Sequence, residues 1–169
     1  PEKHGFDVNI GGCFWGHPAH GYFSPYQMET LTDGPEGEYL TQRLGNEAVR
    51  LIRERDKTKP FFLNFWHYAV HAPMQAPADL VAYFEEKSRK MGLDKLDPFE
   101  VGEHFPIEAK KDQRVVRRTI QSDPVYAAMI YSMDQTVGQL VETLRQEGLE
   151  EDTIVIFTSA NGGLATAEG

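Results

Sequence analysis

The stretch KPFFLNFWHYAVHAPMQAP, residues 59–77, places the tightest limits on how this chain can fold. Its opening lysine-proline pair ends any preceding helix, because proline disfavours the helical conformation of the residue before it. Residues 61–66 form a short apolar and aromatic run, which predicts a buried strand. His67 and His71 follow that run directly. Because ligands bind beyond the carboxyl ends of strands in open α/β sheets, both imidazoles are candidate site residues.

Three helices are predicted around this strand from the spacing of apolar residues. They cover residues 38–56, 78–87 and 124–147, and the last has the broadest apolar stripe. The β-branched run TIVIFT, residues 153–158, follows the third helix and predicts a second buried strand. Because a helix precedes each strand, we expect an α/β fold with a mostly parallel sheet flanked by helices and right-handed crossovers.

Two segments lie outside this regular pattern. Residues 1–37 are rich in glycine, proline, histidine and aromatic residues, which predicts a structured loop. That loop either packs on its own aromatic side chains or forms a wall of a substrate cleft, in which case His17 would contact substrate. Residues 88–121 show no clear period and predict an irregular insertion, which is either a lid or a solvated excursion without a role.

Composition narrows the range of partners. The formal net charge of −9 argues against a general nucleic-acid or anionic-membrane binder, since such proteins present a basic face. No apolar run approaches the roughly 20 residues that span a bilayer. The single cysteine, Cys13, rules out a disulfide within the chain and leaves the redox compartment open. We therefore expect neither nucleic acid nor membrane as a partner.

The second predicted strand also ends in polar residues, Ser159-Ala160-Asn161-Gly162-Gly163. If the two strands are parallel, His71 and Asn161 lie at the same edge of the sheet. A carboxamide oxygen is a hard ligand that suits Ca²⁺ or Mg²⁺, and an imidazole there can act as a general acid or contact an anion. The alternative is a plain turn, in which Asn161 adopts a left-handed conformation.

The motifs KPFFLNFWHYAVHAPMQAP and YAAMIYSMDQTVGQLVETLRQEGLEEDTIVIFTSANGG, in this order, resemble the arylsulfatase-like sulfatase family of the alkaline-phosphatase-like superfamily. The segments GFDVNIGGC, YFSPY and DGPEGEYLTQRL add to the resemblance. It implies hydrolysis of sulfate monoesters by a formylglycine made from a cysteine or serine, with a Ca²⁺ held by carboxylates and an asparagine. By this resemblance His71 contacts the sulfate and assists the leaving group, and Asn161 binds the metal. His17 and His67 are candidate substrate contacts.

The sequence departs from the family pattern in two places. The family usually has aspartate before the asparagine, whereas this chain has Ala160, whose methyl group cannot ligate a cation. The family nucleophile motif, Cys or Ser-x-Pro-x-Arg, does not match the sequence around Cys13, and the acidic pair and the lysine region of the family are also absent. We therefore expect residues 1–169 to be the central part of a sulfatase catalytic domain, an incomplete portion of the fold that is inactive alone.

Two other functions stay open. A non-catalytic sulfatase-like domain would be consistent with Ala160. A phosphatase or phosphodiesterase of the same superfamily is a further alternative, although such sites usually hold two metals with more histidine and aspartate ligands. The expected ligand is a sulfated small molecule or carbohydrate, and exposed sheet edges could also pair with a second copy of the chain. The family is commonly periplasmic, secreted or lysosomal.

Overall fold

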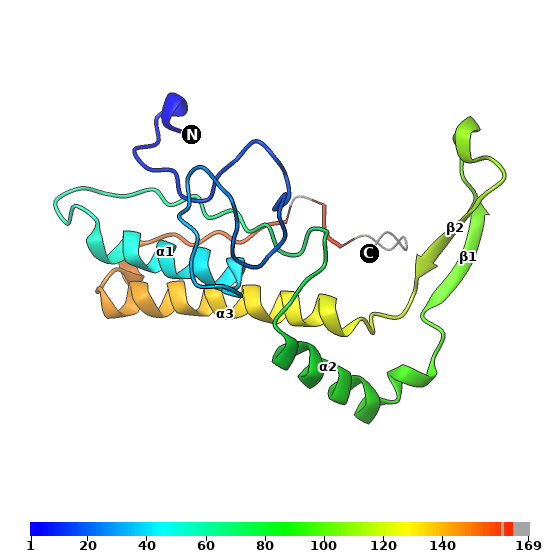
Figure 1. Cartoon of the computed structure of the whole chain (residues 1–169). Coiled ribbons are helices and arrows are strands. Elements are labelled where there is room, and N and C mark those ends of the chain that lie inside the picture. Colours follow the sequence, from blue (N-terminus) through cyan, green and yellow to red (C-terminus); the bar gives the residue numbers. More distant parts are fainter. Residues whose placement is uncertain (160, 164–169) are drawn as a thin grey trace.

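The computed structural model describes residues 1–159 and 161–163, and three α-helices form its frame (Figure 1). A two-stranded sheet and four single turns of 3₁₀-helix complete the described elements. In chain order these are η1 (Glu2–His4), α1 (Leu40–Glu54), α2 (Ala78–Met91), η2 (Leu93–Lys95), β1 (Phe99–His104), η3 (Glu108–Lys110), β2 (Arg114–Arg118), α3 (Pro124–Gln146) and η4 (Glu150–Asp152).

All three predicted helices are confirmed. Asp123 caps α3, since its side-chain oxygen accepts a hydrogen bond of 2.9 Å from the backbone N–H of Tyr126. α2 continues four residues past its predicted end to Met91, where Gly92 adopts the left-handed conformation that ends many helices. Among the described residues, no helix combines the length with the apolar character that crossing a membrane would need.

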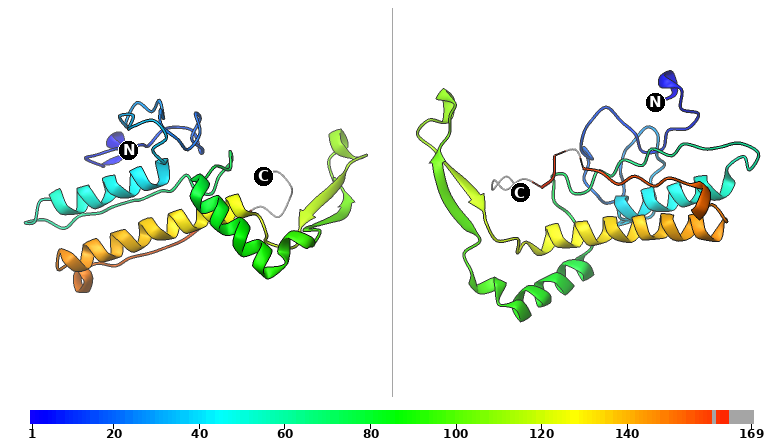
Figure 2. Two further views of the ribbon diagram at one scale, coloured as in Figure 1. Left: turned by 60° about the horizontal axis from the view of Figure 1, so that its bottom comes forward. Right: turned by 180° about the vertical axis from the view of Figure 1, so that it is seen from behind.

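α1 and α3 lie side by side and form the centre of the structure (Figures 1 and 2). Leu44, Ala48 and Ile52 recur at helical spacing on α1 and are buried. The helices approach closely at Gly45, where an added Cβ would lie 2.7 Å from Cγ2 of Thr136. A small residue at this position therefore sets the spacing of the two helices.

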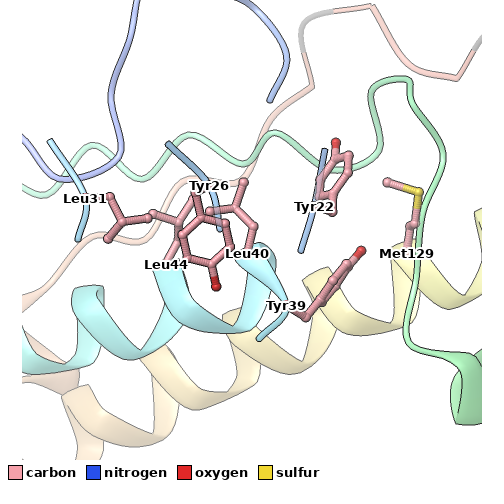
Figure 3. Close-up of a cluster of buried hydrophobic side chains, with 7 residues drawn as sticks. All are labelled: Tyr22, Tyr26, Leu31, Tyr39, Leu40, Leu44 and Met129. Atoms are coloured by element: carbon pink, nitrogen blue, oxygen red, sulfur yellow. The ribbon is translucent and has the colours of Figure 1, made fainter. Parts of the chain in front are cut away.

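Three tyrosines dominate the hydrophobic core, which lies where the N-terminal loop meets the start of α1 (Figure 3). The hydroxyl of Tyr26 donates a hydrogen bond to the carbonyl of Glu38 at 3.0 Å, and that of Tyr39 donates to the carbonyl of Gln75 at 2.9 Å. Residues 1–37 are thus a loop, and two of its aromatic side chains, Tyr22 and Tyr26, are buried against α1 and α3. The cluster consists of Tyr22, Tyr26, Leu31, Tyr39, Leu40, Leu44 and Met129.

The two predicted buried strands differ from expectation. Residues 61–66 and 153–158 are extended, but neither belongs to a sheet, and their apolar side chains are largely exposed. Phe62 is 79 %, Trp66 81 % and Ile154 89 % exposed. The prediction that these segments are buried was wrong for this chain, because a strand becomes paired and covered only where neighbouring strands and layers exist. Among the described residues, the sheet present is antiparallel, and the expected parallel sheet is not formed.

Residues 88–121 also differ from expectation, because this segment is more regular than its sequence predicted. It contains the end of α2 and a hairpin in which β1 pairs antiparallel with β2, with Val101 opposite Val116. The hairpin projects from the helices in every view (Figures 1 and 2). The side chains of β1 are exposed, whereas in β2 Val115 is buried and residues 116–118 are partly buried, so the two strands do not share the apolar alternation by which a half-buried strand is recognised.

Candidate functional site

The site forms where two loops meet, one from the N-terminal segment and one that follows residues 61–66. The imidazole rings of His17 and His71 stack, with centroids 5.6 Å apart and an angle of 20° between their planes. They lie far apart in the sequence, so the fold brings together the residue predicted to be catalytic and one predicted to contact substrate. The side chain of His71 is exposed and that of His17 is partly exposed, so solutes can reach the pair.

Tyr22 holds the loop that carries His71. Its buried hydroxyl lies 2.7 Å from the carbonyl oxygen of Tyr68 and 2.9 Å from that of His71, and it is the donor to both. Burial raises the pKa of Tyr22 well above its ordinary value of 10, so the hydroxyl keeps its proton at neutral pH. The backbone N–H of Tyr22 also donates to Oε1 of Gln75 at 2.8 Å.

A second tyrosine joins the same two loops. The hydroxyl of Tyr68 donates to the carbonyl of Gly11 at 2.7 Å and lies 3.1 Å from Sγ of Cys13. Burial raises the pKa of Tyr68 above its ordinary value of 10, and the hydrogen bond with Cys13 adds to this effect. Cys13 is therefore placed as a neighbour of Tyr68, next to the loop that carries His17.

The orientation of the His71 ring is fixed by the backbone of the next residue, Ala72. Nδ1 lies 2.9 Å from the carbonyl oxygen of Ala72. A carbonyl can only accept a hydrogen bond, so Nδ1 carries the hydrogen that is donated. Nε2 is therefore the nitrogen through which this exposed ring can receive or release a proton.

His67, the third predicted site histidine, has a different environment. Its Nε2 lies 3.5 Å from Oγ1 of Thr136 on α3, and its ring packs on Phe65 with centroids 4.2 Å apart. Burial lowers the pKa of His67 from 6.5 to about 4, so the ring is neutral at physiological pH. The structure thus places His67 against the helices, whereas His17 and His71 form the exposed stack.

Asn161 is exposed and follows the second extended segment. Its Nδ2 donates to the carbonyl of Gly162 at 3.0 Å, which leaves its side-chain oxygen as a possible metal ligand. Ala160, where the resemblance led us to expect an aspartate, lies outside the described residues. Figures 1 and 2 show that both extended segments run in the same direction past α1 and α3, so the loops with His71 and Asn161 follow at the same end.

The described residues do not form a calcium site by themselves. In the described part of the chain, no three or more His, Cys, Asp or Glu side chains gather closely enough to hold a metal ion. Ca²⁺ requires about six to eight oxygen ligands. The single amide oxygen of Asn161 falls far short of that number.

Comparison with known proteins identifies the family. A sequence model of the family described as Sulfatase matches residues 3–167. The chain belongs to the sulfatase family. Mouse (Mus musculus) Arylsulfatase J is 27 % identical over 180 residues, an alignment that covers 100 % of this chain and 25 % of that protein. A protein named Sulfatase from Formosa agariphila is 32 % identical over 135 residues, with 75 % of this chain and 20 % of that protein covered.

This sulfatase chain thus spans about a fifth to a quarter of the length of these relatives. Among solved structures, the sulfatase chain is similar to Ps i-CgsB in complex with k-i-k-neocarrahexaose. The identity is 28 %, the TM-score is 0.43, and the match covers 70 % of this chain and 20 % of that chain.

Sequence reasoning did not identify the two tyrosines that position the site. Tyr22 belongs to the segment YFSPY, and Tyr68 lies between two candidate histidines. The sequence offered a signal for Tyr68, which directly follows the candidate His67. The sequence does not show the hydrogen-bond partners of the two tyrosines, because both hydroxyls donate to backbone carbonyls more than forty residues away in the chain.

Proposed function

We propose that this chain forms part of an enzyme that hydrolyses sulfate monoesters, with a formylglycine nucleophile supplied by residues outside this chain. The observation that carries the proposal is an exposed His71, whose Nδ1 lies at hydrogen-bond distance from the carbonyl of Ala72 and so directs Nε2 to proton transfer, in a sulfatase sequence. Reaction at sulfur produces an alkoxide or phenoxide leaving group, which needs a proton donor.

The chain's own residues would act on the sulfate and on the leaving group. In its cationic form His71 carries a hydrogen on Nε2 and donates that proton to the ester oxygen as the sulfur–oxygen bond breaks. The ring then remains neutral and keeps its hydrogen on Nδ1. His17, stacked on His71, would contact the negatively charged sulfate oxygens when it is protonated. His67, also a candidate substrate contact, would support the loop from its position against α3.

In this proposal, Asn161 is the one residue of this chain that would bind calcium. A bound Ca²⁺ would supply positive charge to the sulfate oxygens. Asn161 would give one of its ligands, and the others would come from residues outside this chain, because the described residues form no metal site of their own. With Ala160 in place of a ligating aspartate, we expect weaker calcium binding than a site with that carboxylate would have.

We propose further that residues 61–66 and 153–158 become strands of a mostly parallel sheet once neighbouring strands are present. Their extended backbone and exposed apolar side chains support this. Pairing with a second copy of the chain through the same exposed edges is the alternative. The substrate would be a sulfated aryl compound or carbohydrate, in keeping with the name of the similar Arylsulfatase J.

The proposal can be tested by assaying the complete gene product on 4-nitrophenyl sulfate and 4-nitrophenyl phosphate. We expect hydrolysis of the sulfate, and a fall in kcat of about 10²- to 10⁴-fold in His71→Ala, which lacks the general acid. His104→Ala is a matched control, since Nδ1 of His104 also lies near a backbone carbonyl, that of Lys111, but on the projecting hairpin. Preference for the phosphate, or equal effects of the two variants, would show that the proposal is wrong.

The second candidate, a non-catalytic domain of the same fold, is favoured by Ala160. Calorimetric titration of the complete gene product with Ca²⁺ separates the two functions. An enzyme should bind the ion, and Ala160→Asp should tighten binding because it adds a charged oxygen ligand. Absence of calcium binding together with absence of sulfate hydrolysis would support the non-catalytic domain.

A further inference from the structure

An exposed row of rings leads away from the His17–His71 stack. The ring of Trp15 lies 5.7 Å from that of His17, and the ring of Phe14 lies 4.7 Å from that of Trp15, both measured between centroids. Phe14 is 87 % and Trp15 is 50 % exposed. Two large apolar rings are thus presented to solvent beside two imidazoles, an arrangement of apolar surface next to polar groups that is typical of ligand sites.

This row belongs to a loop whose position is fixed. Sγ of Cys13 lies 3.5 Å from the carbonyl oxygen of Trp15 and 3.1 Å from the hydroxyl of Tyr68. Tyr68 in turn donates to the carbonyl of Gly11. The backbone around Trp15 is therefore connected to the loop that carries His71, so the indole and the imidazole hold a set relation to one another.

We propose that Trp15, with Phe14 beside it, is the subsite for the ring that bears the sulfate ester. This inference rests on the proposed function, in which His17 and His71 take the sulfate. Sugars and aryl groups are both six-membered rings with an apolar face, and such faces pack against aromatic side chains. The sulfate oxygens and the ring are adjacent parts of one substrate, as the imidazoles and the indole are adjacent parts of one surface.

The geometry explains why tryptophan suits this position. An indole offers the largest flat surface among the side chains, and its N–H can donate to a ring hydroxyl. The stacked imidazoles, once protonated, attract the anionic end of the substrate but bind its apolar end only weakly. A substrate would therefore be oriented by charge at His71 and by ring packing at Trp15.

Kinetics of the complete gene product test this subsite. We expect Trp15→Ala to raise KM about tenfold for the ester whose ring packs there, while the inhibition constant of inorganic sulfate stays unchanged. Trp15→Phe should restore most of the loss, because a flat ring is retained. Tyr83→Ala, which removes an exposed ring on α2, is the matched control. Parallel assays with 4-methylumbelliferyl sulfate and N-acetylglucosamine 6-sulfate decide between an aryl and a sugar ring.

The outcomes separate this inference from the proposed function. If the wild type hydrolyses an ester but Trp15→Ala leaves KM unchanged for both, the subsite is wrong and the proposed function stands. If the wild type hydrolyses neither ester, the subsite is tested by ligand binding, measured as tryptophan fluorescence of the present chain. The chain has two tryptophans, so Trp66→Phe leaves Trp15 as the sole reporter. Phenyl sulfate should quench the fluorescence of Trp15, and absence of quenching would overturn the inference. The inference would also be overturned if acrylamide cannot quench Trp15 in the complete gene product, because the indole would then be covered.

Discussion

Acidification should destabilise this chain through His67 before it affects the carboxyl groups. His67 packs against α3, and burial lowers its pKa from 6.5 to about 4, whereas the unfolded chain regains the ordinary value. Between these two pH values, the unfolded chain takes up a proton that the folded chain excludes. The free energy of unfolding therefore falls as the pH falls through this window, stays level above pH 6.5, and loses no more through His67 below about pH 4.

The size of the effect follows from the two pKa values. Each tenfold difference in proton affinity corresponds to about 1.4 kcal/mol, so the whole window amounts to at most about 3.5 kcal/mol. About 2.5 kcal/mol of this should already be lost at about pH 4.5. Carboxyl groups respond at lower pH. The hydrogen bond from Arg55 holds the pKa of Glu147 below its usual 4.5, so the stabilisation by Glu147 disappears only below that value.

Urea unfolding followed by circular dichroism at about pH 7.5 and about pH 4.5 measures this loss. His67→Phe keeps a ring but removes the titrating group, so its free energy of unfolding should fall by about 2.5 kcal/mol less than that of the wild type. His104→Phe, on the exposed hairpin, should behave as the wild type does. The reasoning is refuted if His67→Phe and the wild type show the same pH dependence, or if NMR titration gives His67 its ordinary pKa.

Two further substitutions test the frame and the support of the site. Gly45→Ala brings a Cβ to 2.7 Å from Thr136, and thermal unfolding should show a free energy of unfolding that is lower by about 1–3 kcal/mol. Gly138→Ala has nothing within 4 Å of the added Cβ, and its free energy of unfolding should rise by up to about 1 kcal/mol. Equal effects would contradict the close approach of α1 and α3. Tyr22→Phe removes the hydroxyl that donates to two loop carbonyls. Its free energy of unfolding should be lower by about 1–2 kcal/mol, and its KM for an aryl sulfate should be higher. Tyr131→Phe, at an exposed position, should change neither quantity.

The helices were predictable because their determinants are local. Leu44, Ala48 and Ile52 mark the buried face of α1 by spacing alone, and Asp123 followed by Pro124 marks the start of α3. Neither signal requires knowledge of a distant partner. The hairpin β1–β2 escaped prediction because Val101 and Val116 pair across a turn although neither is buried, and sequence periodicity reports burial rather than pairing.

The site was predictable in its residue types but not in its geometry. His17 and His71 were both candidates, yet their stacking depends on hydrogen bonds from tyrosines to backbone carbonyls, which carry no sequence signature. His67 follows the same aromatic run as His71 but has an interior position. Three residues separate them, and the turn between them directs one ring to α3 and the other to solvent.

The two faces of residues 61–66 differ, and this difference indicates which parts of the site would depend on the proposed sheet. Phe65 packs against the core cluster, whereas Phe62 and Trp66 are exposed, so one face is already used by the helices and the other is not. The His17–His71 stack is held by Tyr22 and by its neighbours in the loops, none of which belongs to the uncovered face. The imidazole pair can therefore keep its geometry without added strands. A metal site at Asn161, which has few contacts of its own, would depend on residues beyond this chain.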